Sequence, residues 1–171
     1  MPIITAADEN GGATMVLSPR EGDNHWQPEP ANGYISVRVA PKLIDMEHPI
    51  GLGTQTLPPG GFVREHAHDQ NEEVLHFISG TGTAIVDGVE HAITPGTTIF
   101  VGKNRRHKFI NTGSVELHWM WLIVPNGLED FFEAIGRRKV EGGEDPTPFP
   151  RPENVLEIER RTVFAAGSEK V

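Results

Sequence analysis

The sequence predicts an antiparallel β-sandwich or β-barrel. Short runs in which hydrophobic and polar residues alternate recur along the middle of the chain, with tight turns between them. Asp87-Gly88 stands between two β-rich runs, residues 83–86 and 89–93, and this pair is a strong signal for a hairpin with a type I′ turn. The chain also carries 19 glycines and 14 prolines among its 171 residues, which favours turn-rich β structure over a helical bundle.

The predicted strands follow one another from residue 34 to residue 125. Residues 1–33 are rich in Gly, Pro, Asn and charge, so we expect a largely irregular N-terminal arm. Residues 34–40 alternate and predict a half-buried strand, and residues 51–57 predict another that ends at a Pro-Pro-Gly-Gly turn. Residues 116–124 predict a long apolar strand before Pro125, and one of its faces is formed by Leu117, Trp119, Trp121 and Ile123.

The hydrophobic period changes to a helical one after Pro125. Four apolar residues at helical spacing predict a helix, namely Leu128, Phe131, Phe132 and Ile135. Asn126 is expected to cap it with Glu129 as capping-box partner, and Gly136 to end it. Four prolines between residues 146 and 152 predict an extended linker, and residues 153–160 a further short helix. We expect residues 126–171 to pack on the barrel within a single domain.

Composition excludes several classes of function. The net charge of −9 argues against nucleic-acid partners and against an anionic membrane surface. The absence of cysteine excludes disulfides, zinc–thiolate sites and thiol nucleophiles. Residues 1–15 have no basic segment followed by an apolar run, and no stretch approaches the roughly 18 apolar residues of a membrane helix. These features lead us to expect a cytoplasmic protein with no membrane partner.

Two histidines and a glutamate predict a metal site. His66 and His68 are two residues apart, so on an extended strand both imidazoles point to the same face. Glu73 follows a polar bend, and its carboxylate can return to the same point if a new strand begins there. His76 then falls on the opposite face of that strand. One carboxylate with imidazoles suits a first-row transition metal better than calcium, which prefers an all-oxygen shell.

A second motif completes the pattern. Residues 96–111 read as strand, turn and strand, and His107 begins the second strand. The two stretches resemble the paired motifs of the cupin superfamily over about residues 50 to 125. The first motif, G-x5-H-x-H-x3,4-E-x6-G, matches at Gly60, His66, His68, Glu73 and Gly80; the second, G-x5-P-x-G-x2-H-x3-N, matches at Gly96, His107 and Asn111. Gly102 replaces the usual Pro and Asn104 the usual Gly, and both substitutes still form turns.

The resemblance implies an all-β, antiparallel double-stranded β-helix, the jelly-roll barrel, in a short quercetinase-like monocupin with a short C-terminal helix. It also implies one divalent transition-metal ion, either Fe, Mn, Ni or Co, with Zn as a further option. The ligands would be His66, His68, Glu73 and His107, and they leave open positions on an octahedral ion. Glu73 would be either a permanent ligand or a catalytic group that leaves the metal and accepts a substrate proton. Similar cupins form dimers, so we expect a homodimer.

Four further residues are candidates for the substrate pocket. Arg64 has the same strand parity as His66, so we expect it to point inward and hold an anionic group. Gln55 and Phe109 are also expected to face the interior, and His118 would join them if its face of the strand looks into the barrel. Phe100 is expected in the core. We expect four apolar residues to supply surface for the dimer: Val74, Ile78, Trp119 and Trp121. For Trp119 and Trp121 the core of the barrel is the alternative position.

Three functions fit this sequence. The first is a metal-dependent, dioxygenase-type oxidoreductase that acts on a small phenolic or enolic substrate. The second is a metal-dependent lyase or isomerase that acts on a small oxygenated acid, with Arg64 gripping its carboxylate. The third is a non-catalytic cupin that binds a small ligand. Fold and ligands alone do not choose among these functions.

Overall fold

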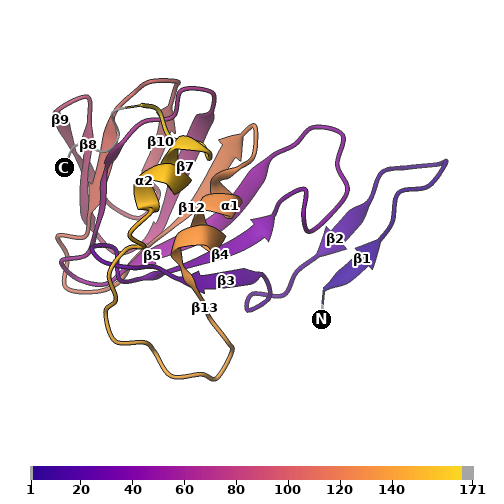
Figure 1. The fold of residues 1–171 in the computed structure, drawn as a ribbon, viewed down its shortest axis with the longest axis horizontal. Coiled ribbons are helices and arrows are strands. Elements are labelled where there is room, and N and C mark those ends of the chain that lie inside the picture. Colours follow the sequence, from indigo (N-terminus) through magenta and orange to yellow (C-terminus); the bar gives the residue numbers. More distant parts are fainter. Residues whose placement is uncertain (1, 167–171) are drawn as a thin grey trace.

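The computed structural model describes residues 2–166 and shows two β-sheets that face each other in a barrel, which confirms the predicted fold class (Figure 1). The larger sheet has the strand order β10-β7-β12-β5-β4-β3-β13 and the smaller one β6-β11-β8-β9, with antiparallel pairing throughout. Residue 1 of the predicted arm and residues 167–171 of the predicted tail lie outside the described part of the chain.

The strands between residues 34 and 124 agree with the predicted runs, whereas those at Asp23–Trp26 and Arg137–Arg138 were not predicted. The larger sheet contains β3 (Asp23–Trp26), β4 (Tyr34–Val39), β5 (Gly51–Leu57), β7 (Glu72–Ser79), β10 (Thr98–Val101), β12 (Leu117–Val124) and β13 (Arg137–Arg138). The smaller sheet contains β6 (Phe62–His66), β8 (Gly82–Val86), β9 (Val89–Ile93) and β11 (His107–Ile110). β8 and β9 meet at Asp87 and Gly88, whose φ angles of 48° and 81° confirm the predicted hairpin.

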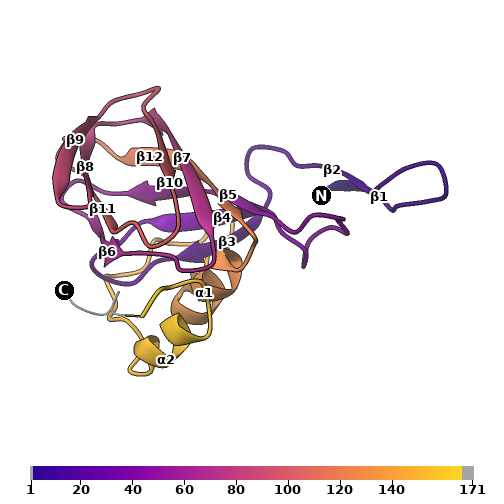
Figure 2. The same ribbon diagram turned by 90° about the horizontal axis from the view of Figure 1, so that it is seen from above.

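The N-terminal region contains three short strands that we did not predict. β1 (Ile3–Thr5) and β2 (Thr14–Val16) form a hairpin that projects away from the barrel (Figures 1 and 2). β3 pairs with β4 inside the larger sheet, with His25 opposite Ile35. Outside these three short strands the described part of residues 1–33 is irregular, so most of the arm is as expected. The three strands are only three or four residues long, and the turn-forming residues between them dominate the local composition.

The core lies between the two sheets. The inward residues of β12 are fully buried, and Trp119 packs against Phe77 and Phe109 with ring centroids 5.7 and 6.1 Å apart. Burying one such side chain contributes about 1.5–3 kcal/mol. Trp119 and Trp121 are 0% exposed, so the core, one of their two expected positions, is confirmed, and the other is corrected because they supply no surface for a dimer. The second correction is Phe100, which is 64% exposed on the edge strand β10 because alternation turns it outward.

Two short helices lie together on one side of the barrel (Figure 2). They are α1 (Leu128–Ile135), as predicted, and α2 (Val155–Arg160). The N-cap of α1 is Gly127 rather than Asn126, because the Glu129 carboxylate accepts hydrogen bonds from both Asn126 Nδ2 and Gly127 N, at 2.6 and 2.8 Å. Among residues 2–166 no helix has the length and apolarity needed to cross a bilayer.

Candidate metal centre

His66 and His107 come from neighbouring strands of the smaller sheet. β6 and β11 run antiparallel, and their register places His107 directly opposite His66. Opposed side chains on one face of an antiparallel pair are close neighbours. The two ring centroids are accordingly 4.0 Å apart, although the residues are far apart in sequence.

His68 and Glu73 reach the same point from the connection after β6 and from the opposite sheet. The backbone carbonyl of His68 accepts a hydrogen bond of 2.7 Å from Asn104 N, and Asn104 adopts a φ of 60° in the turn before β11. The turn former at this motif position therefore holds the His68 loop in place. Glu73 lies on the inner face of β7 in the larger sheet and is 4% exposed. The four side chains thus join both sheets.

The side-chain nitrogen and oxygen atoms that could bind a metal converge on one point without hydrogen bonds of acceptable geometry between them. One such atom from each of the four residues lies within 4.8 Å of all the others. Glu73 Oε2 is 3.2 Å from His107 Nε2 and 3.5 Å from His68 Nε2. These three atoms are buried, and none has a hydrogen-bond partner with acceptable geometry among residues 2–166. Buried polar atoms are nearly always paired, so three orphans at one point fit a site built for an ion.

Backbone carbonyls fix the histidine tautomers. The Nδ1 atoms of His66, His68 and His107 lie 2.8, 2.9 and 3.0 Å from the carbonyl oxygens of Arg64, Val163 and Arg105, respectively. Each Nδ1–H therefore donates to a carbonyl, which leaves the Nε2 lone pair available. This is the arrangement a metal-ligating imidazole needs.

The surroundings also set the protonation states. Burial, reinforced by the neighbouring imidazoles of His107 and His68, holds the pKa of His66 well below its usual range. Burial would raise the pKa of the Glu73 carboxyl, but its interactions with His107 and His68 outweigh burial and lower that pKa. Neutral His66 and ionised Glu73 are the protonation states that bind metals.

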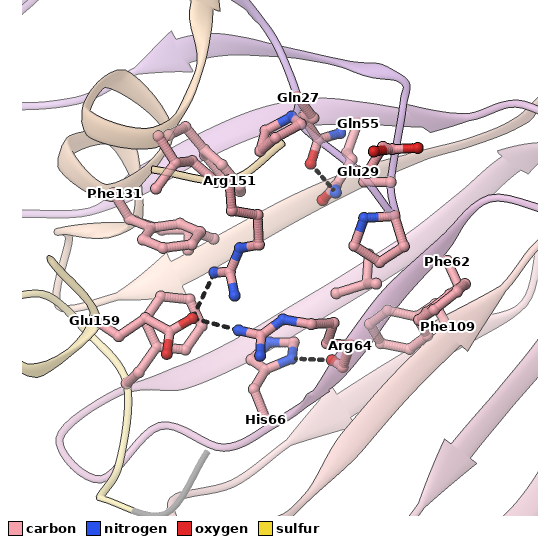
Figure 3. Close-up of a pocket in the computed structure, with 18 of the residues that line it drawn as sticks. Gln27, Glu29, Gln55, Phe62, Arg64, His66, Phe109, Phe131, Arg151 and Glu159 are labelled. Atoms are coloured by element: carbon pink, nitrogen blue, oxygen red, sulfur yellow. Dashed lines mark hydrogen bonds and ion pairs between the residues drawn. The ribbon is translucent and has the colours of Figure 1, made fainter. Parts of the chain in front are cut away.

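A cavity opens beside this cluster, and His66 and Glu73 form part of its wall. Most of the remaining wall is apolar and comes from both sheets and both helical regions: Phe62, Leu75, Phe109, Leu128, Phe131, Phe132, Ile135 and Phe164. A few polar side chains converge on the same space (Figure 3). An apolar pocket with a few convergent polar groups is the usual form of a small-molecule site.

Comparison with known proteins agrees with this geometry. Residues 53–123 match the family model described as a cupin domain, and the matched segment contains all four converging residues. This chain therefore carries a cupin domain over residues 53–123. A predicted oxalate decarboxylase from Thermotoga maritima has the same fold, with a TM-score of 0.58 and 21% identity over 66% of this chain and 100% of that one. A cupin-superfamily sugar phosphate isomerase from Silicibacter pomeroyi has a TM-score of 0.55 and 15% identity, covering 66% of this chain and 76% of that one.

Curated relatives match only part of their own length. Protein SchB from Streptomyces halstedii is 31% identical over 43% of this chain and 54% of its own length. The tetracenomycin polyketide synthase protein TcmJ from Streptomyces glaucescens is 30% identical over 59% of this chain and 62% of its own length. The cupin thus spans a little over half the length of these relatives.

Three of the four predicted pocket residues line the cavity of this cupin. They are Gln55, Arg64 and Phe109, and the Gln55 amide donates a hydrogen bond of 2.8 Å to Gln27 Oε1. His118 does not. Its neighbour Trp119 points into the core, so strand alternation turns His118 outward, where it lines a separate surface hollow with Tyr34 and Arg38. The prediction that His118 lies in the substrate pocket was therefore wrong.

His76 lies outside the centre, as the strand parity predicted. Its side chain is exposed on the outer face of β7, and its Nδ1 lies 2.8 Å from Thr98 Oγ1. His76 is therefore a suitable control for substitutions of the converging histidines.

The C-terminal segment supplies cavity residues that sequence reasoning missed. Arg151 and Glu159 line the cavity, and Glu159 is only 2% exposed. The Phe164 ring covers the cluster, with its centroid 5.3 Å from those of both His66 and His68. No signal in the sequence marks Arg151 or Glu159 as inward-facing, because both positions depend on how this segment docks on the barrel.

Proposed function

We propose that this cupin binds one divalent transition-metal ion through the Nε2 atoms of His66, His68 and His107 and a carboxylate oxygen of Glu73. The observation that carries the proposal is the set of three buried, unpartnered ligand atoms at one point. Three imidazoles with one carboxylate favour Fe, Mn, Ni or Co, and Zn also accepts such ligands. His66 and Glu73 line the cavity, so a ligand in the cavity can reach the ion.

We further propose a dioxygenase-type oxidation of a small phenolic or enolic substrate. A bound ion of this kind supplies Lewis-acid chemistry and a template for substrate and dioxygen. The aromatic wall, including Phe62 and Phe109, would hold a planar apolar body and exclude water. Glu73 lies at the boundary of ion and cavity, where its carboxylate can accept the proton of a substrate hydroxyl.

A lyase or isomerase acting on a small oxygenated acid is the second candidate. The guanidinium group of Arg64 on the cavity wall favours it, because a guanidinium pairs well with a carboxylate. A curated relative from Thermotoga maritima, 29% identical over 40% of this chain and 56% of its own length, is named an oxalate-binding protein. That name describes the relative, and for this cupin it supports only the choice of acids as test compounds.

Elemental analysis tests the metal proposal. Wild type, His66→Ala, His107→Ala and His76→Ala are purified identically without chelator and reloaded with metal. We expect near-stoichiometric metal in wild type and His76→Ala, and strongly reduced metal in the other two, because each of these loses one imidazole ligand. Equal metal in all four proteins, or none in the reloaded wild type, would end the proposal.

Oxygen consumption separates the candidate reactions. The metal-loaded protein is mixed with a panel of phenols, enols and small hydroxy acids in an oxygen electrode and, in parallel, under anaerobic conditions. Oxygen uptake that disappears in His107→Ala supports the dioxygenase. Anaerobic turnover of an acid supports the lyase or isomerase, and saturable binding without turnover supports the ligand-binding cupin.

A further inference from the structure

One part of the cavity wall is strongly polar and comes largely from outside the cupin motifs. Arg64 on β6 and Arg151 in the linker before α2 both donate to the same oxygen, Oε1 of Glu159 on α2 (Figure 3). The Arg151 contact is 2.5 Å long. The side chains of Arg64 and Arg151 are 17% and 18% exposed, and that of Glu159 is 3% exposed.

These three groups leave positive charge unbalanced beside the cavity. Two guanidinium groups face one carboxylate, and each guanidinium has five N–H donors in a fixed planar fork. One carboxylate oxygen cannot satisfy them. Among the described wall residues the other carboxylates are Glu73, in the proposed metal centre, and Glu29, which is exposed at the rim. A partly buried excess of positive charge costs free energy unless a bound anion balances it.

Glu159 also keeps one oxygen unused. Its Oε2 is buried and has no hydrogen-bond partner among residues 2–166. A ligand that brings an O–H or N–H to this atom would satisfy it, while an anionic group of the same ligand would meet the two guanidinium forks. The site thus offers guanidinium N–H donors for an anionic group together with one carboxylate oxygen, Glu159 Oε2, as acceptor for a hydroxyl group.

We propose that Arg64, Arg151 and Glu159 form a carboxylate-binding subsite, and that the substrate is a small hydroxylated aromatic or enolic carboxylic acid. The inference rests on the proposed function, since it names the substrate class of that same cavity. The carboxylate of the substrate accepts hydrogen bonds from the guanidinium N–H groups that Glu159 leaves free, and the apolar part of the substrate lies against the aromatic wall. Glu159 holds both arginines in place. Bidentate guanidinium–carboxylate pairing would orient the acid towards the metal cluster.

Calorimetry with two matched probes tests the subsite. The probes are 2-hydroxybenzoate and its neutral analogue 2-hydroxybenzamide, titrated into wild type, Arg151→Gln, Glu159→Gln and the double variant. We expect wild type to prefer the acid by about tenfold or more, in keeping with a charge-assisted hydrogen-bonded pair. Arg151→Gln should remove most of the preference for the acid, and Glu159→Gln should increase that preference. The double variant should recover part of the preference lost in Arg151→Gln, because its net charge returns to that of wild type.

Controls keep the result interpretable. Arg105→Gln changes an exposed arginine that pairs with Asp87 at 3.0 Å outside the cavity wall, so it should leave both affinities unchanged. Thermal melting identifies any variant that fails to fold, and Arg151→Lys, which keeps the charge but loses the fork, should give an intermediate acid affinity. Equal affinities for acid and amide in wild type, or binding of neither, would overturn the subsite.

Metal-free protein separates this inference from the proposed function. Without the ion, the acid preference and its dependence on Arg151 should persist, because the arginines are not metal ligands. A preserved preference in a protein that fails the elemental analysis would leave the subsite standing and remove the metal proposal. An acid preference that is insensitive to every one of these substitutions would overturn the subsite alone.

Discussion

At Gly53 on β5 the backbone runs so close to its neighbours that a methyl group has no room. A Cβ atom there would lie 2.4 Å from Ser36 O and 2.5 Å from Trp121 Cζ2. We expect Gly53→Ala to lower the free energy of unfolding by about 1–3 kcal/mol, because the core must shift to accept it. Urea denaturation measures the change. Gly12→Ala, with nothing within 4 Å of its added Cβ, is the control and should lie close to wild type.

Single residues also show how far the site could be predicted from the sequence. His66, His68 and Glu73 could be assigned because strand parity and a short bend determine where their side chains point. His107 followed from the second motif. Arg151 and Glu159 could not be assigned, because their positions depend on how the C-terminal segment docks on the barrel, and local periodicity carries no information about that docking.

Among the elements, β3 depends on one carboxylate for several of its contacts. Asp23 pairs with His25 at 2.9 Å, with Lys42 at 3.1 Å and with Arg138 on β13 at 3.2 Å. Burial raises the pKa of Asp23, but Lys42 and His25 outweigh burial, so the folded pKa lies below its ordinary value of 3.8. A lowered folded pKa means that ionised Asp23 stabilises the fold above the unfolded pKa, and that this contribution disappears as pH falls through the folded value.

Asp23→Asn should therefore destabilise the protein in a pH-dependent way. We expect a loss of about 1–2 kcal/mol in the free energy of unfolding between about pH 5 and 7, which shrinks towards zero as pH falls through the lowered pKa of folded Asp23. Chemical denaturation across this pH range measures the difference. Glu144→Gln, at an exposed carboxyl, should show little effect at any pH. A loss for Asp23→Asn that is constant with pH would mean that the Asp23 charge is not its source.

The predictability of the elements follows their length and alternation. β12 and α1 were predicted because eight residues with a clear period identify both the element and its buried face. β3 was missed because four residues next to a turn-rich stretch show no period. The cap of α1 was misassigned because Glu129 binds back to Gly127 N, so a glycine occupies the N-cap without a side-chain cap.

Across the whole molecule, one apolar row crosses the outer face of the larger sheet. The strand registers align Phe100, Val74, Leu122 and Leu52 on β10, β7, β12 and β5, and none of these four side chains is fully buried. Ile78 and Val124 extend the same face and are 46% and 45% exposed. We propose that this face joins two copies of the chain, since contiguous exposed apolar surface marks interaction sites.

Light scattering tests the homodimer. The chain mass is 18.8 kDa, and we expect about twice that value for wild type at micromolar concentration. Phe100→Glu should shift the mass towards the monomer, because a buried unpaired charge opposes association. Val89→Glu introduces the same charge at a residue that is 57% exposed on the smaller sheet, and it should leave the mass unchanged. A monomeric wild type would refute this assembly.

The docking of the C-terminal segment has a consequence for how such a protein can diversify. The four converging residues lie within residues 53–123, whereas Arg151 and Glu159 belong to a later stretch that packs over the cavity. The proposed subsite thus combines Arg64 from the barrel with two side chains from this later stretch. If the proposed function holds, a change in the later stretch would alter which molecules the cavity accepts, while the four converging residues of the barrel stay in place.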